Sequence, residues 1–147
     1  RDDIYVGYRY IDMKGITPNF PFGHGLSYTT FTVGEPTISK TTIKKGGKLT
    51  IKCKVTNTGN REGAEVVQLY IGDNESSLPR PVKELKGFKK LHLDAGQSGV
   101  AEFTITEDDL KFFDDKRHEW VSESGEFTAY IATSAEEILH QVNFFLK

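Results

Sequence analysis

The fold is decided by the stretch Lys48-Leu49-Thr50-Ile51-Lys52-Cys53-Lys54-Val55-Thr56-Asn57. Its apolar side chains stand at every second position, and lysine or threonine fills most positions between them. Because successive side chains of a strand point to opposite faces, this alternation predicts a strand with one buried and one solvated face. The following residues, Asn57-Thr58-Gly59-Asn60, predict a turn, since asparagine and glycine tolerate positive φ.

Similar alternation continues on the C-terminal side of this strand. Residues 66–71 predict a second strand, and we expect its other face, with Val66, Gln68 and Tyr70, to be partly covered as well. Residues 84–93 predict a third strand with a kink or bulge at Gly87. Further strands are predicted at residues 99–106, 119–121, 126–131 and 139–146.

Two short segments between these strands have other signals. Residues 94–97 predict a turn. The sequence Thr106-Glu107-Asp108-Asp109 resembles a capping box, in which the Asp109 carboxylate caps at most one or two helical turns that reach about Phe113. Trp120 follows a charged run, and we expect it to plug one end of the core.

These segments together predict an all-β chain. About seven short strands follow one another at intervals of 8–15 residues from about residue 31, with almost no helix. This pattern favours a two-sheet antiparallel β-sandwich of the immunoglobulin-like type, and a closed barrel is the alternative.

The composition bounds the function classes. Of 147 residues 37% are hydrophobic, which suffices for one core and excludes a disordered chain. The net charge is −2, so we expect no nucleic acid partner, and no apolar run is long enough for a membrane span. The single cysteine, Cys53, excludes an internal disulfide and predicts a buried, inert thiol.

The first thirty residues differ from the rest. The stretch Asn19-Phe20-Pro21-Phe22-Gly23-His24-Gly25-Leu26-Ser27-Tyr28 has neither helical nor strand periodicity. Exposing so many aromatic side chains to water is unfavourable, so we expect the segment to pack on the sandwich or on a neighbouring domain. Residues 1–30 are therefore interpreted as an interdomain connection and residues 31–147 as the sandwich. A start at Arg1 with Met13 as the sole methionine suggests a piece of a longer protein.

The same opening segment carries a family resemblance. Tyr5-Val6-Gly7-Tyr8-Arg9-Tyr10 and Pro18 to Phe31 resemble the passage from the catalytic domains of family 3 glycoside hydrolases into their C-terminal fibronectin type III-like domain. Later matches follow in the same order, and the resemblance spans essentially the whole chain. These are Val55-Thr56-Asn57-Thr58-Gly59, Gly63-Ala64-Glu65-Val66-Val67-Gln68-Leu69-Tyr70, Glu84-Leu85-Lys86-Gly87-Phe88-Lys89, Trp120-Val121 and Gly125-Glu126-Phe127.

The resemblance implies a non-catalytic accessory domain. Enzymes of this family are retaining β-glucosidases, β-xylosidases and related exo-acting hydrolases, and their nucleophile lies in an N-terminal barrel that this chain does not encode. The implied role is to stabilise the catalytic domains of the same parent chain, with a contribution to substrate positioning. The residues expected in interdomain packing are Tyr8, Arg9, Tyr10, Phe20, Pro21, Phe22, Gly23, His24, Gly25 and Tyr28.

No catalytic, cofactor or metal site is predicted in the chain itself. Acidic clusters occur at Asp2-Asp3, Glu107-Asp108-Asp109, Asp114-Asp115 and Glu136-Glu137, and such clusters are usually solvated or cap helices. The four histidines, His24, His92, His118 and His140, show no metal-ligand spacing.

Two other function classes stay open. An independent carbohydrate-binding module would stack oligo- or polysaccharide rings on aromatic side chains, and Tyr70, Trp120 and Tyr130 are the candidates. A fibronectin-like protein-interaction domain is the other alternative. The compartment is open too, because a secreted, periplasmic or cytoplasmic parent fits the sequence.

Overall fold

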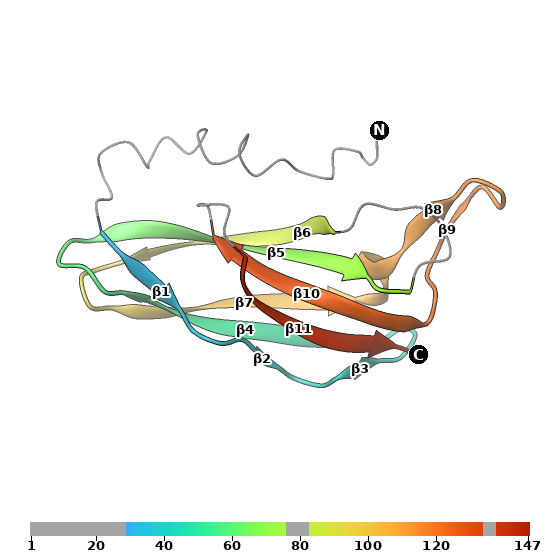
Figure 1. Cartoon of the computed structure of the whole chain (residues 1–147), viewed down its shortest axis with the longest axis horizontal. Coiled ribbons are helices and arrows are strands. Elements are labelled where there is room, and N and C mark those ends of the chain that lie inside the picture. Colours follow the sequence, from blue (N-terminus) through green and yellow to red (C-terminus); the bar gives the residue numbers. More distant parts are fainter. Residues whose placement is uncertain (1–28, 76–82, 134–137) are drawn as a thin grey trace.

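The computed structural model describes residues 29–75, 83–133 and 138–147. In these residues the chain forms eleven strands and one 3-10 turn, arranged as two sheets packed face to face with a small hairpin at one end (Figure 1). The chain is therefore all-β, and the sandwich is confirmed over the closed barrel. None of the described residues forms a helix long and apolar enough to cross a membrane.

The larger sheet has five strands in the order β3-β11-β10-β5-β6. Its strands are β3 (Thr42–Ile43), β11 (Ile138–Leu146), β10 (Gly125–Thr133), β5 (Gly63–Asp73) and β6 (Glu84–Leu93). All neighbours are antiparallel except β3 and β11, which are parallel. Strand β6 therefore forms one free edge of this sheet among the described residues.

The second sheet is built around β4 (Lys48–Asn57). One side of β4 pairs with β1 (Phe31–Val33) and β2 (Thr37–Ile38), and the other side pairs along its length with β7 (Ser98–Thr106). The chain then passes through the 3-10 turn η3 (Glu107–Leu110) into a hairpin of β8 (Phe112–Asp114) and β9 (Glu119–Val121).

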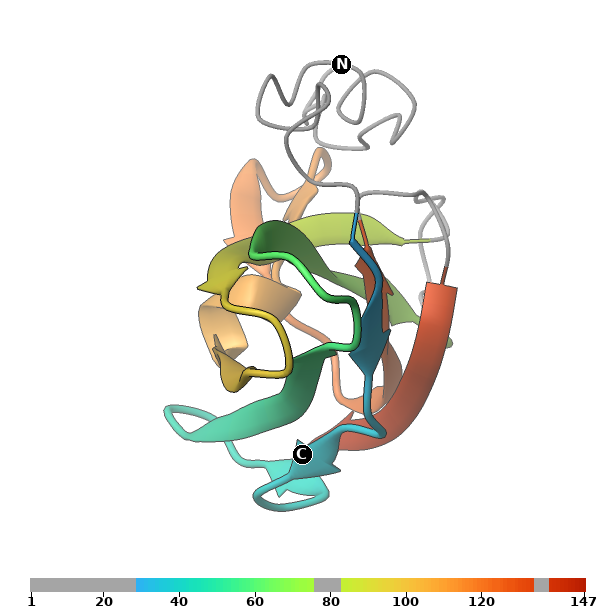
Figure 2. The ribbon, with the colours of Figure 1, turned by 90° about the vertical axis from the view of Figure 1, so that its left-hand side faces the viewer.

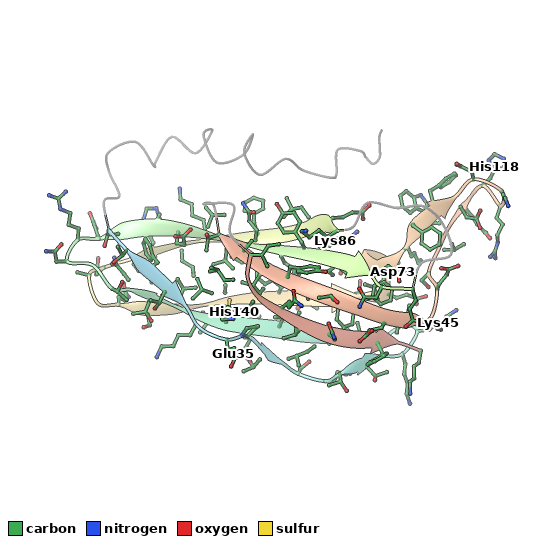
Figure 3. The ribbon with its side chains drawn as sticks, in the orientation of Figure 1. Glu35, Lys45, Asp73, Lys86, His118 and His140 are labelled. Atoms are coloured by element: carbon green, nitrogen blue, oxygen red, sulfur yellow. The ribbon has the colours of Figure 1, made fainter. Side chains whose placement is uncertain are left out.

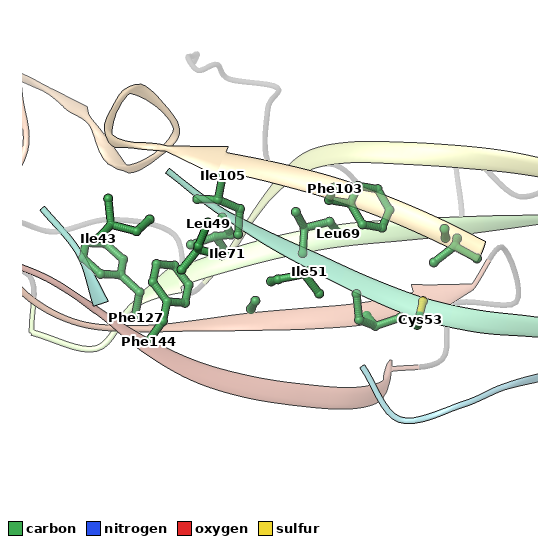
Figure 4. Packing of buried hydrophobic residues seen from close by; sticks show 14 of the residues in the cluster. Ile43, Leu49, Ile51, Cys53, Leu69, Ile71, Phe103, Ile105, Phe127 and Phe144 are labelled. Atoms are coloured by element: carbon green, nitrogen blue, oxygen red, sulfur yellow. The ribbon is translucent and has the colours of Figure 1, made fainter. Parts of the chain in front are cut away.

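The core lies between the two sheets and comes from the alternation in the sequence. Leu49, Ile51, Cys53 and Val55 all point inward from β4 and are buried, as predicted. Figure 4 shows how side chains of both sheets interdigitate there, with the rings of Phe127 and Phe144 stacked at 5.6 Å between centroids. Burial raises the pKa of the Cys53 thiol to about 11, which confirms the prediction of an inert thiol.

Most predicted strands are confirmed within a few residues, and the predicted bulge is confirmed as well. The register between β5 and β6 shifts between Leu69 and Tyr70, where Leu69 pairs with Gly87 and Tyr70 pairs with Leu85. The extra residue is Lys86. The Asp109 cap is also confirmed, since its carboxylate accepts the Thr106 amide at 2.8 Å.

The segment after β7 departs from the expectations at two points. The limit of one or two helical turns is met by a single 3-10 turn, but the turn ends at Leu110 and the chain returns to strand at Phe112. Trp120 does not plug the core, since 61% of its surface is exposed and its ring stands edge-on to that of Phe113. Because the capping box lies just before Phe112 and Phe113, it extended the expected turn over β8, and this strand was not predicted.

The outer faces of the two sheets differ. Lys48, Lys52 and Lys54 point outward from β4 into solvent. On β5, by contrast, the outward side chains Gln68 and Tyr70 are as buried as the core. The expectation that the second face of this strand is covered is thereby confirmed.

Candidate functional site

The residues predicted in interdomain packing lie outside the described residues. This holds for all ten, from Tyr8 to Tyr28. Their role therefore stays a prediction. The described residue that follows them is Thr29, and its contacts show how this end of the sandwich is held.

A single buried asparagine holds the place where the chain enters the sandwich. Asn57 has no exposed surface, and its side-chain oxygen accepts the Thr29 hydroxyl at 2.7 Å and the Gly59 amide at 3.0 Å. Its side-chain nitrogen donates to the carbonyls of Arg61 at 2.7 Å and Leu93 at 3.0 Å. Both donors and both acceptor positions of the amide are therefore used. We call Thr29, Asn57 and Gly59 the Asn57 joint.

Backbone contacts tighten this joint. The Thr58 amide donates to the Thr30 carbonyl at 2.8 Å, and the Gly96 amide donates to the Asn57 carbonyl at 2.9 Å. A Cβ at Gly59 would collide with the Thr29 hydroxyl, so only glycine fits beside Thr29. The chain thus enters the sandwich through a fixed contact that also reaches the turn between β6 and β7.

The second feature is a groove between the free edges of β6 and β7, which we call the β6–β7 groove. It has a volume of about 580 Å³ and reaches the core residues Leu69 and Phe103. Phe88 and Val100 line it with 62% and 55% of their surfaces exposed. Gly87 has no side chain to fill the groove, and a Cβ there would stand 3.5 Å from the Phe103 ring.

The charged side chains of the β6–β7 groove are partly engaged within the chain. The Lys86 ammonium lies 3.1 Å from the Glu84 carboxylate, and Asp109 caps Thr106. Lys89 and Glu102 also line the groove. Apolar and polar side chains therefore line the groove together.

The β8–β9 hairpin carries a separate pair of exposed aromatic side chains. Phe113 and Trp120 pair across its two strands, with their rings 5.7 Å apart and both exposed. Figure 1 shows the hairpin at one end of the sandwich and the β6–β7 turn at the other, and Figure 2 looks along the axis that joins them.

The three candidate sugar-contact residues do not form one platform. Tyr70 and Tyr130 are directly opposed in β5 and β10, whereas Trp120 lies on the separate β8–β9 sheet. Tyr70 is 3% exposed and its hydroxyl donates to Gln68, so its ring offers no free face in this structure. Tyr130 is half-buried with the Lys83 ammonium 5.2 Å from its ring centre. Of the three, Trp120 presents the most exposed ring.

One carboxylate links three segments at the end of the sandwich. Glu107 accepts the Ser122 hydroxyl at 2.6 Å and the Gly46 amide at 3.2 Å. These two hydrogen bonds, from Ser122 first and then Gly46, hold the pKa of Glu107 below its usual value, and Lys45 and Lys111 lower that pKa further. Glu107 thus ties the turn before β4 to the residue after β9.

Among the described residues, the other acidic side chains singled out in the sequence make separate local contacts. Asp108 pairs with Lys111 at 2.9 Å and raises the pKa of that lysine, and Asp114 accepts the Lys116 amide at 3.0 Å. Figure 3 shows His118 at the tip of the hairpin and His140 far from it on β11. Within residues 29–75, 83–133 and 138–147, no group of three or more His, Cys, Asp or Glu side chains could hold a metal ion.

The comparisons with known proteins agree with this fold. The family model described as a fibronectin type III-like domain matches residues 65–135. β-Glucosidase BoGH3A of Bacteroides ovatus is 49% identical over 144 residues, which are 98% of this chain and 19% of that protein. Thermostable β-glucosidase B of Acetivibrio thermocellus is 41% identical over 139 residues, which are 95% of this chain and 18% of that protein.

Solved structures point the same way. A β-glucosidase from Erythrobacter marinus superimposes with a TM-score of 0.76 and 35% identity, over 87% of this chain and 17% of that one. A β-glucosidase from Kluyveromyces marxianus gives a TM-score of 0.75 and 37% identity, over 99% of this chain and 17% of that one. This chain spans less than a fifth of the length of each of these relatives.

Fold and comparisons together define the class as a fibronectin type III-like β-sandwich. The chain matches family 3 β-glucosidases over nearly its whole length and the fibronectin type III-like model over residues 65–135, so the resemblance seen in the sequence is confirmed.

Proposed function

We propose that this chain is a non-catalytic accessory domain that stabilises the catalytic domains of a family 3 glycoside hydrolase and helps to position its substrate. The parent enzyme would cleave β-glycosidic bonds at non-reducing ends. The observation that carries this proposal is the Asn57 joint, which fastens the chain to the sandwich at Thr29.

The joint supports bracing because it removes freedom where the two parts meet. A flexible linker would leave the sandwich free to move, and its presence would then add little to the stability of its neighbours. Here a fully hydrogen-bonded, fully buried amide anchors the residue that follows the aromatic segment. With a fixed connection, contacts between the sandwich and the catalytic domains stabilise the folded state of both.

Removal of the sandwich from the parent enzyme tests the proposal. The parent without residues 31–147 should melt several degrees lower than the intact enzyme and lose activity on heating. The 147-residue chain alone should not hydrolyse nitrophenyl glycosides above a protein-free control. If the truncated parent keeps its melting temperature and its activity, the bracing role is wrong.

Carbohydrate binding is a second candidate, favoured by the exposed ring of Trp120. Pyranose rings stack on such rings, and the neighbouring Phe113 fixes the orientation of the indole. Cello- and xylo-oligosaccharides titrated into the 147-residue chain would shift the Trp120 indole resonance if it acts as a binding module. The matched variant Trp120→Ala should then abolish saturable binding. A protein-interaction role stands as the third alternative, and capture by separately expressed catalytic domains would support it.

A further inference from the structure

We infer that the β6–β7 groove is the surface on which the catalytic part of the same polypeptide docks, and that apolar side chains of that part cover Phe88 and Val100. This inference rests on the proposed function and names the contact through which it operates. The groove, the Asn57 joint and the distribution of exposed apolar side chains each bear on it.

The first argument is the shape and lining of the groove. Two large apolar side chains, Phe88 and Val100, stand more than half exposed on either side of an opening that reaches Phe103 in the core. Keeping such surface in water is unfavourable, and its burial by a partner would contribute about 25 cal/mol for each Å² covered. Gly87 keeps the groove open, since a side chain at that position would lie over Phe103.

The second argument concerns the polar groups of the groove. Lys86 pairs with Glu84 and Asp109 caps Thr106, so two of the charged side chains are held by the chain itself. Lys89, Glu102 and Thr104 also line the groove. A protein surface suits this mixed lining, because it can cover Phe88 and Val100 with apolar side chains and offer polar partners beside them.

The third argument identifies the occupant as part of the same polypeptide. Asn57 binds the chain where it enters at Thr29, and the same residue contacts Leu93 and Gly96 at the β6–β7 turn. Val100 lies three residues beyond Gln97 in that turn, about 10 Å along an extended strand. Thr29 is therefore held close to the Val100 end of the groove, and a partner joined to the chain at Thr29 has a high effective concentration there.

The opposite edge of the sandwich supplies a natural comparison. Phe145 lies on β11 beside β3, at the far edge of the five-stranded sheet from β6, and 40% of its surface is exposed. Phe145 is a large, partly exposed apolar side chain like Phe88, but it does not line the groove and does not contact the turn held by Asn57. A docking surface at β6–β7 leaves Phe145 accessible.

Cysteine labelling tests the inference directly. The natural Cys53 is 3% exposed with a raised pKa, so it reacts slowly and leaves a low background. Phe88→Cys, Val100→Cys and the control Phe145→Cys would each be treated with a maleimide, once in the 147-residue chain and once in the full-length parent. We expect labelling in the parent to slow by about tenfold or more at positions 88 and 100, and to stay the same at position 145.

The outcomes separate this inference from the proposed function. Equal labelling at positions 88 and 145 in the parent would overturn the docking surface, even where truncation of the parent still lowers its melting temperature. Slow labelling at position 88 in the 147-residue chain alone would also overturn it. If labelling in the 147-residue chain slows further as its concentration rises, a second copy covers the groove. If the slow labelling does not depend on concentration, residues of the chain itself cover it.

Discussion

The Asn57 joint and the β6–β7 groove lie close together, yet they are built in opposite ways. At the joint every polar group of a buried side chain has a partner, and a neighbouring glycine leaves no room for another atom. At the groove large apolar side chains stand in water, and a glycine leaves space open. The joint is complete within the chain, whereas the groove is the surface that we infer a partner to cover. Stability within the domain and contact with its neighbours therefore depend on different residues.

The largest expected effect comes from Asn57→Ala, which removes the joint. The variant leaves the carbonyls of Arg61 and Leu93 and the Gly59 amide without their side-chain partner in a buried place. We expect the free energy of unfolding of the 147-residue chain to fall by about 3 kcal/mol, measured by urea titration. The control Asn60→Ala alters an exposed residue of the same turn. If both variants unfold alike, the joint does not hold the fold together.

Gly59→Ala should have the next largest effect, because it adds one methyl group to a filled space. The new Cβ collides with the Thr29 hydroxyl and lies 3.1 Å from the Thr30 amide nitrogen, so the chain must shift where it enters. We expect a loss of about 2 kcal/mol in unfolding free energy. The control is Gly34→Ala, where the added Cβ meets its nearest neighbour at 3.5 Å without strain. If Gly59→Ala and Gly34→Ala are equally stable, Thr29 and Thr30 can shift to accommodate the added methyl group at little cost.

Glu107 provides a smaller, pH-dependent effect at the other end of the sandwich. Its pKa in the folded state lies below the ordinary value of 4.5, so it stabilises the fold above that value and loses this contribution as pH falls through the folded pKa. Because Glu107 is exposed, the effect is modest.

The measurement compares melting temperatures at neutral and acidic pH. Glu107→Gln should melt lower than the wild type near pH 7, and this difference in melting temperature should shrink as pH falls below 4.5 and through the lower pKa of the folded state. Ser122→Ala removes one of the two hydrogen-bond donors and should reproduce part of this difference. If the difference in melting temperature does not change with pH, the carboxylate charge of Glu107 is not its cause.

The two regions also differ in how far the sequence predicts them. Alternation within β4 reveals the buried face, because Leu49 to Val55 contribute to one core. Asn57 is recognisable as a turn residue, but its partners Thr29 and Leu93 lie 28 and 36 residues away and no local pattern connects them. The groove depends on two edges that meet only in three dimensions. Its one sequence signal is Gly87, which predicted the bulge and not the opening.

The smallest expected effect is the one that separates the two regions most sharply. Phe88→Ser removes an aromatic side chain that is 62% exposed, so little apolar burial is lost within the chain. We expect the unfolding free energy of the 147-residue chain to change by less than about 0.5 kcal/mol, far below the effect of Asn57→Ala. In the full-length parent the same substitution should lower the melting temperature, while Phe145→Ser should leave it unchanged. A large loss in the 147-residue chain would instead make Phe88 part of the domain's own core, and the contrast between joint and groove would disappear.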